Sequence, residues 1–113
     1  MMFPLFLASL AAQVAANSPE VARAGDLLAA WQICLVDHYN GRHADPADVA
    51  TVVDEAFVRC AAGETALRDQ IASFSSPRAA DTFLAELRPQ KRDELLAAAA
   101  ESRRLRAQRE RPQ

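Results

Sequence analysis

The chain has 113 residues, of which 50% are hydrophobic and 25% are charged, and this composition excludes an intrinsically disordered protein. Its 25 alanines and 3 glycines argue against an all-β domain, and its 2 cysteines are too few for a disulfide-dense miniprotein or a four-cysteine zinc module. The net charge of −2 divides into −6 over residues 17–87 and +4 over residues 88–113, so an acidic body carries a basic tail.

Residues 1–16 are typical of an export signal, because a short uncharged apolar stretch is followed by small side chains. Signal peptidases need small residues at positions −1 and −3, so Val14 and Ala16 predict cleavage after Ala16. The apolar stretch is too short to span a bilayer of about 30 Å. The segment lacks a Lys or Arg, and the alternative is a hydrophobic first helix packed on the core of a cytoplasmic protein. We expect a periplasmic or secreted protein, with a cytoplasmic one as the alternative.

A first helix is expected to begin at Ser18 and Pro19, because a capping hydroxyl followed by proline marks a helix start. Asn40 and Gly41 predict its end, since glycine readily adopts the left-handed conformation that closes helices. Residues at helical spacing form its buried stripe: Val21, Ala24, Leu28, Trp31, Leu35 and His38, widened by Leu27, Cys34 and Tyr39.

A second helix is expected to follow a proline-containing cap. Asp45 is the expected N-cap, Pro46 is the first helical residue, and Asp48 lies in the first turn. Gly63 predicts the end of this helix. The buried face consists of Val49, Val52, Val53, Ala56, Phe57 and Cys60, and the opposite face carries Thr51, Asp54, Glu55 and Arg59.

The remaining residues predict a short helix over 64–73 and a further helix that starts at Ser75-Ser76-Pro77. Pro89 lacks a backbone N–H and clashes with the preceding turn, so we expect a kink or a restart there. Apolar residues mark the buried edges: Leu67, Ile71, Phe74, then Ala80, Phe83, Leu84, Leu87, and finally Leu95, Leu96, Ala99 and Leu105. The predicted fold is all-α, a small bundle of four to five short helices that forms one domain over residues 17–111 after the signal peptide.

Cys34 and Cys60 lie on the apolar faces of two different predicted helices. In an exported protein such a pair is expected to form a disulfide. In an ideal antiparallel hairpin that turns near His43, however, Cys34 faces Val52, and Cys60 lies about 12 Å further along the axis, which is too far for a disulfide. The bond therefore requires crossed helices or a loop that folds back, and the alternative is two buried free thiols. The Cys-x-x-Cys spacing of redox-active pairs is absent.

The expected turn between the first two helices holds four side chains of types that bind metals, Asp37, His38, His43 and Asp45. His38 also fits the buried stripe and Asp45 fits an N-cap, so a solvated helix-turn-helix accounts for the cluster. We expect no metal and no cofactor, and a metal- or small-molecule-binding module over residues 37–45 is the alternative function. Without a nucleophile motif, a phosphate-binding glycine loop or a zinc-protease helix, the sequence identifies no catalytic residue and argues against an enzyme.

The basic tail is the candidate binding surface, and its cations are Arg103, Arg104, Arg106, Arg109 and Arg111. On a helix these side chains attract anionic lipid headgroups or an acidic partner, although a solvated terminal helix explains the same charges. Aromatic residues for base stacking are not interleaved with them, so we expect no nucleic acid. The leading hypothesis is a non-enzymatic domain that binds an envelope protein or an anionic membrane surface.

Three features of this sequence resemble those of other proteins: Trp31 three residues before Cys34, a capped second helix rich in valine, and Cys60. In these features residues 20–75 resemble uncharacterised small exported helical proteins of bacteria that contain two cysteines. The resemblance implies an exported helical fold and implies no activity. The basic C-terminal helix departs from that pattern.

Overall fold

The computed structural model describes residues 18–42 and 48–111, and these residues form helices and no strand. The helices are α2 (Pro19–Arg42), α3 (Val49–Arg59), α4 (Ala61–Phe74) and α5 (Pro77–Glu110). The predicted all-α class is therefore confirmed. The predicted signal peptide, residues 1–16, lies outside the described residues and stays a prediction.

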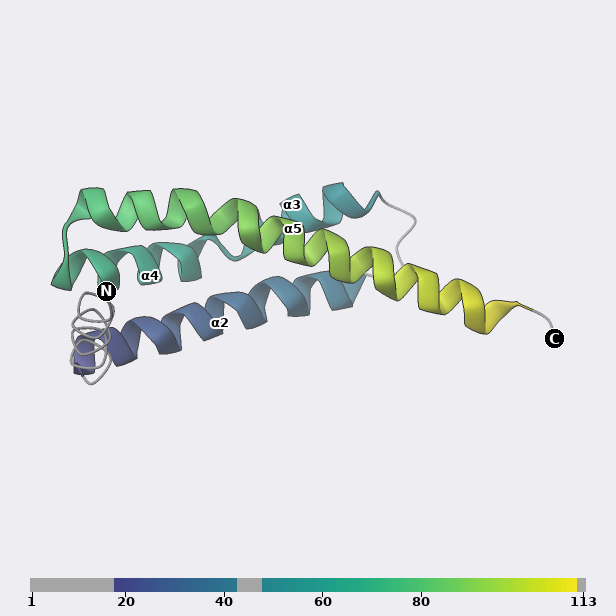
Figure 1. Ribbon diagram of the computed structural model, residues 1–113, viewed down its shortest axis with the longest axis horizontal. Coiled ribbons are helices and arrows are strands. Elements are labelled where there is room, and N and C mark those ends of the chain that lie inside the picture. Colours follow the sequence, from purple (N-terminus) through teal and green to yellow (C-terminus); the bar gives the residue numbers. More distant parts are fainter. Residues whose placement is uncertain (1–17, 43–47, 112–113) are drawn as a thin grey trace, which may run out of the picture.

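The helices form an elongated bundle in which α4 lies between the first parts of α2 and α5, and α5 passes in front of α3 in this view (Figure 1). α2 packs mainly on α4 and also on α3, and α5 packs on both of these short helices. α2 and α5 make little direct contact with each other. The C-terminal part of α5 extends beyond the other three helices (Figure 1).

A single core connects all four helices and is centred on Trp31, whose side chain is completely buried. The Trp31 ring meets the Phe57 ring edge-on, with ring centroids 5.9 Å apart. The other buried members of this core come from every predicted stripe: Ala24, Leu35, Tyr39, Val52, Val53, Ala56, Cys60, Leu67, Leu84, Leu95 and Ala99. The helical spacing of apolar residues thus predicted most of the buried positions correctly.

The serine-proline helix starts are confirmed. The Ser76 hydroxyl accepts a hydrogen bond of 3.0 Å from the Ala79 backbone N–H, and Pro77 is the first residue of α5. The Ser18 hydroxyl accepts a longer one, 3.5 Å, from the Val21 N–H. These short-range bonds satisfy N–H groups that the first turn of a helix leaves free.

Both predicted glycine stops are wrong. α2 continues through Gly41 to Arg42, and Gly63 lies inside α4. A glycine ends a helix by entering the left-handed region, and no glycine in the described part of the chain has a positive φ. The break between α3 and α4 falls instead at Cys60, which has φ −99° and ψ 15°.

The predicted start of the second helix is wrong by several residues. α3 begins at Val49 with Asp48 as its N-cap, so Asp48 precedes the helix and does not lie in its first turn. The Asp48 side chain makes no capping hydrogen bond. The predicted cap Asp45 and the following Pro46 lie outside the residues that the structure describes.

Pro89 does not end a helix, because α5 runs through it as one helix of 34 residues. Of the two expected outcomes, a kink or a restart, the restart is therefore wrong, and Figure 1 shows α5 changing direction part-way along its length. Proline removes one backbone hydrogen bond. Leu84 and Leu87 before it and Leu95 and Leu96 after it pack on the same core, and this packing holds both halves of α5 in place.

Four residues predicted on buried faces are exposed: Cys34, Phe74 (41%), Phe83 (41%) and Leu105 (40%). Phe74 ends α4 and Phe83 lies early in α5, near the turn where the bundle ends, while Leu105 lies late in α5. The apolar spacing is helical at these positions, but the described helices cover them only in part.

Candidate functional site

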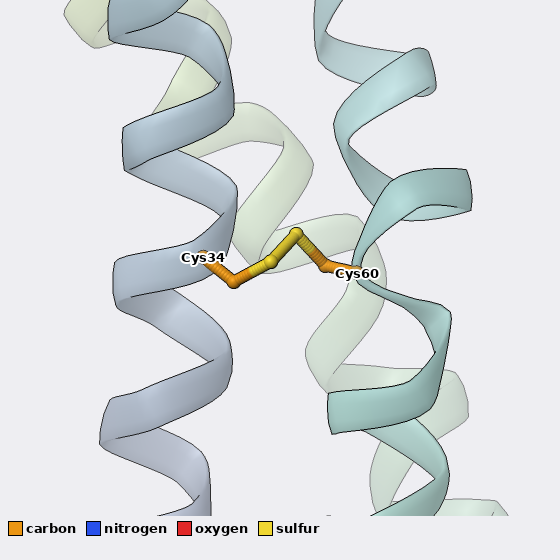
Figure 2. Close-up of a disulfide and its surroundings, with 2 residues drawn as sticks. All are labelled: Cys34 and Cys60. Atoms are coloured by element: carbon orange, nitrogen blue, oxygen red, sulfur yellow. A yellow bond between two sulfur atoms is a disulfide. The ribbon is translucent and has the colours of Figure 1, made fainter.

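A disulfide joins Cys34 of α2 to Cys60, as the sequence predicted (Figure 2). The two sulfur atoms are 1.99 Å apart and the two Cα atoms are 6.0 Å apart. Figure 2 shows Cys60 at the narrow break between two helical segments. Cys60 is 2% exposed, whereas Cys34 lies on the surface of α2, so the bridge leads from the surface into the core.

The helix register permits this bond without a loop that folds back. α2 ends at Arg42 and α3 begins at Val49, so residues are counted inward from those two ends. This count places Cys34 opposite Phe57, three residues from Cys60. At 1.5 Å per residue the remaining offset is about 4.5 Å, which is compatible with the observed Cα separation. The expected offset of about 12 Å was too large, because it was counted from a turn near His43, whereas the described helices end at Arg42 and begin at Val49.

The predicted metal-binding turn is only partly described, since His43 and Asp45 lie outside the described residues. Within residues 18–42 and 48–111, no three His, Cys, Asp or Glu side chains form a group that could hold a metal ion. The His38 Nε2 atom lies 3.2 Å from the Glu55 Oε2 atom, and Arg42 binds the same carboxylate. His38 therefore connects α2 to α3, and the metal-binding alternative stays a prediction.

Ion pairs between exposed side chains connect α5 to the short helices. The Arg92 guanidinium hydrogen-bonds Asp54 at 2.8 Å and holds the pKa of that carboxyl below its usual value. Arg68 of α4 lowers the pKa of Asp81 in the same way, through a hydrogen bond of 2.9 Å. Exposed ion pairs individually contribute little to the free energy of unfolding, so the attachment of α5 depends mainly on its buried apolar residues.

A hollow of about 610 Å³ opens where α5 crosses the junction of α3 and α4. Its walls are Asp54, Phe57, Val58, Ala61, Arg88, Pro89 and Arg92. The Arg88 guanidinium lies 5.9 Å from the centre of the Phe57 ring and binds Glu64 at 2.7 Å. Arg92 binds Asp54, and the floor is apolar, with Val58 76% exposed. Each charged group of this hollow is therefore paired with an opposite charge, Arg92 with Asp54 and Arg88 with Glu64.

A second hollow, of about 440 Å³, lies between the C-terminal end of α2 and the C-terminal part of α5. Its walls are Tyr39, Asn40, Ser102, Leu105, Arg106, Arg109 and Glu110. The structure thus brings two of the predicted surface-binding arginines, Arg106 and Arg109, together with Tyr39. The sequence placed Tyr39 only in the core stripe, because no short-range pattern shows that residues more than sixty positions apart share one hollow.

The other predicted surface arginines lie outside this hollow. Arg104 binds Glu101 of the preceding turn at 2.6 Å and lowers the pKa of that carboxyl. Arg103 lies in α5, and Arg111 is the C-cap residue of the helix. All five cations lie after Ala99, the last buried residue of α5.

Among the described helices, none combines the length and the apolarity needed to span a bilayer. Comparison with protein-family models, with curated proteins and with solved structures finds no significant match to this chain. The resemblance to small exported helical proteins therefore stays a prediction, and function has to be argued from the surfaces described above.

Proposed function

We propose that this chain is an exported, non-enzymatic helical domain that binds an anionic surface of the cell envelope through the C-terminal part of α5. The observation behind the proposal is a cluster of arginines that follows Ala99, the last buried residue of α5, in the helix whose C-terminal part extends beyond the other helices (Figure 1): Arg103, Arg104, Arg106, Arg109 and Arg111. Residues 102–111 have a net charge of +4, although the whole chain has a net charge of −2.

The disulfide supports the export part of this proposal. Disulfides persist in the periplasm and outside the cell, whereas the cytosol keeps thiols reduced. Cys60 is buried in the core, so the bond connects the helices that form that core. The apolar residues 1–16 and the small residues at Val14 and Ala16 support the same location.

The charge of the segment suits a weak, reversible attachment. A basic residue close to an anionic membrane contributes about 1 kcal/mol, so a net charge of +4 favours binding by a few kcal/mol at low salt. Salt screens such attraction over about 8–10 Å near physiological ionic strength. The acidic remainder of the chain opposes non-specific adsorption of the whole molecule, and this directs the contact to the end of α5.

The test compares the chain without residues 1–16 with a second form that also lacks residues 102–113, in sedimentation with vesicles of phosphatidylglycerol or phosphatidylcholine. We expect only the longer form to bind, only to phosphatidylglycerol, and to dissociate as salt rises. The truncation removes the end of α5 and leaves every buried residue in the chain, so the shorter form should keep a helical circular dichroism spectrum.

A full-length variant with all five tail arginines changed to glutamine is the matched control, because it removes the charge and keeps the helix length. It should behave like the truncated form. Equal and negligible binding by all three proteins would contradict the proposal and leave the tail as a solvated helix. Loss of the helical signal on truncation would instead show that Leu105 is an anchor of the core.

A further inference from the structure

The two ends of the disulfide differ in their access to solvent. Cys34 is exposed on α2, whereas Cys60 is 2% exposed and belongs to the core. A thiol that approaches the folded protein therefore reaches Cys34 and not Cys60. Access decides which sulfur of a disulfide is attacked, and exposed disulfides include the labile, regulatory and catalytic ones. This bond is thus open to attack in the folded state, and at one end only.

The surface of α2 around Cys34 carries short side chains. Ala30 lies one turn before Cys34 and Asp37 lies one turn after it, and both are exposed. Helical side chains lean toward the N-terminus of their helix, so Asp37 leans toward Cys34 and Ala30 leans away from it. Ile33 precedes Cys34 and is 59% exposed, so it offers an apolar contact to a protein that approaches this face.

The packing of α2 does not depend on the disulfide alone. Trp31 and Leu35, on either side of Cys34 in the sequence, are buried in the same core as Val53 of α3 and Leu67 of α4. These contacts keep α2 on the two short helices when the sulfur–sulfur bond is broken. The bond can therefore open and close between two folded forms of the protein.

We propose that the disulfide is a site of reversible exchange, in which Cys34 forms the mixed disulfide with a dithiol oxidoreductase. A thiolate of the partner attacks the Cys34 sulfur and forms a new S–S bond. The bond to Cys60 breaks, and the Cys60 sulfur leaves with the bonding electron pair and takes a proton from water. The second thiolate of the partner then attacks the partner's own sulfur in the mixed disulfide, and Cys34 leaves as a thiolate.

The complete exchange gives two electrons to this chain and converts the dithiol of the partner into a disulfide. The same steps in reverse close the bond. Opening it releases Cys60, the residue at the break between α3 and α4, from α2. The exchange does not depend on the proposed binding of α5 to an anionic surface.

The first experiment traps the mixed disulfide. The oxidised chain without residues 1–16 is mixed with a thioredoxin variant that keeps its attacking cysteine and has serine in place of the second one. Free thiols are then alkylated and the product is digested with trypsin, which cleaves after arginine and leaves Cys34 in residues 24–42 and Cys60 in residues 60–68. Mass spectrometry should find thioredoxin joined to residues 24–42. Attachment to residues 60–68, or no mixed disulfide, would overturn the proposal.

The second experiment distinguishes exchange in the folded state from exchange in unfolded molecules. The rate of reduction by glutathione should rise in proportion to the thiol concentration. Asp37→Arg should increase that rate about two- to tenfold, because it replaces a negative charge beside Cys34 by a positive one that attracts the anionic thiolate. High salt should remove the difference.

Asp26→Arg is the matched control, because Asp26 is exposed on the same helix eight residues before Cys34. It should leave the rate unchanged. Equal rates in the two variants, or a rate that reaches a limit set by global unfolding, would show that only unfolded molecules react. The reduced protein should keep its helical circular dichroism and form the bond again on oxidation. Loss of that helical signal would overturn the reversible exchange.

Discussion

Breaking the disulfide between Cys34 and Cys60 is expected to remove a large share of the stability of this domain. The bond closes a chain segment with a sequence separation of 26. The loop entropy that such a cross-link removes from the unfolded chain corresponds to about 3.5 kcal/mol. Small domains have a free energy of unfolding of about 5–15 kcal/mol, so the reduced protein should unfold far more easily while still folding under mild conditions.

The different exposure of the two cysteines determines which variant isolates the cross-link. Cys60 is 2% exposed within the core, so a smaller side chain there would leave a cavity and a polar one would bury an unpaired group. Cys34 is exposed, and Cys34→Ser changes only a surface side chain. This variant removes the bond and keeps the buried sulfur in place.

The assay is urea unfolding, followed by circular dichroism, of the oxidised wild type, the reduced wild type and the Cys34→Ser variant in reductant. The last two should agree with each other and lie about 3–4 kcal/mol below the first, with melting temperatures lower by on the order of 15–25 °C. The Cys60 thiol of the variant should react with a thiol reagent only on unfolding. Equal urea midpoints for oxidised and reduced protein would refute the loop-entropy argument.

Two further predictions concern the helices. Gly63 lies inside α4, and a Cβ atom there would sit 3.6 Å from the Trp31 side chain, an ordinary contact. Gly63→Ala should therefore raise the free energy of unfolding by about 0.5–1 kcal/mol. Gly25→Ala in α2 is the control and should raise it by a similar amount. A lower free energy of unfolding in Gly63→Ala alone would show that the packing at Trp31 cannot accept a methyl group. Arg68 lowers the pKa of Asp81 mainly through a hydrogen bond. This pair therefore stabilises the folded state at pH values above the unfolded-state pKa of Asp81, and that stabilisation is lost as the pH falls through the folded-state pKa. An NMR titration should show the Asp81 pKa rising toward its ordinary value in Arg68→Gln, and an unchanged value would mean that the pair does not form in solution.

Local patterns were enough to predict the helical class and most of the core. Val52, Val53 and Phe57 recur at helical spacing, and a helix with that spacing presents them on one side whatever it packs against. The start of α5 depends on Ser76 and Pro77, which act on backbone groups within a few residues. Interactions of such short range are visible in the order of the residues.

The helix ends and the candidate site depend on residues that are far apart in the chain. Pro89 disfavours a helix locally, but leucines on both sides of it pack on one core and keep α5 continuous. Tyr39 and Arg109 share a hollow because the C-terminal end of α2 lies beside the C-terminal part of α5, while α3 and α4 pack against both helices. The free energy of such packing depends on how whole helices are placed, so residue spacing along the sequence does not reveal it.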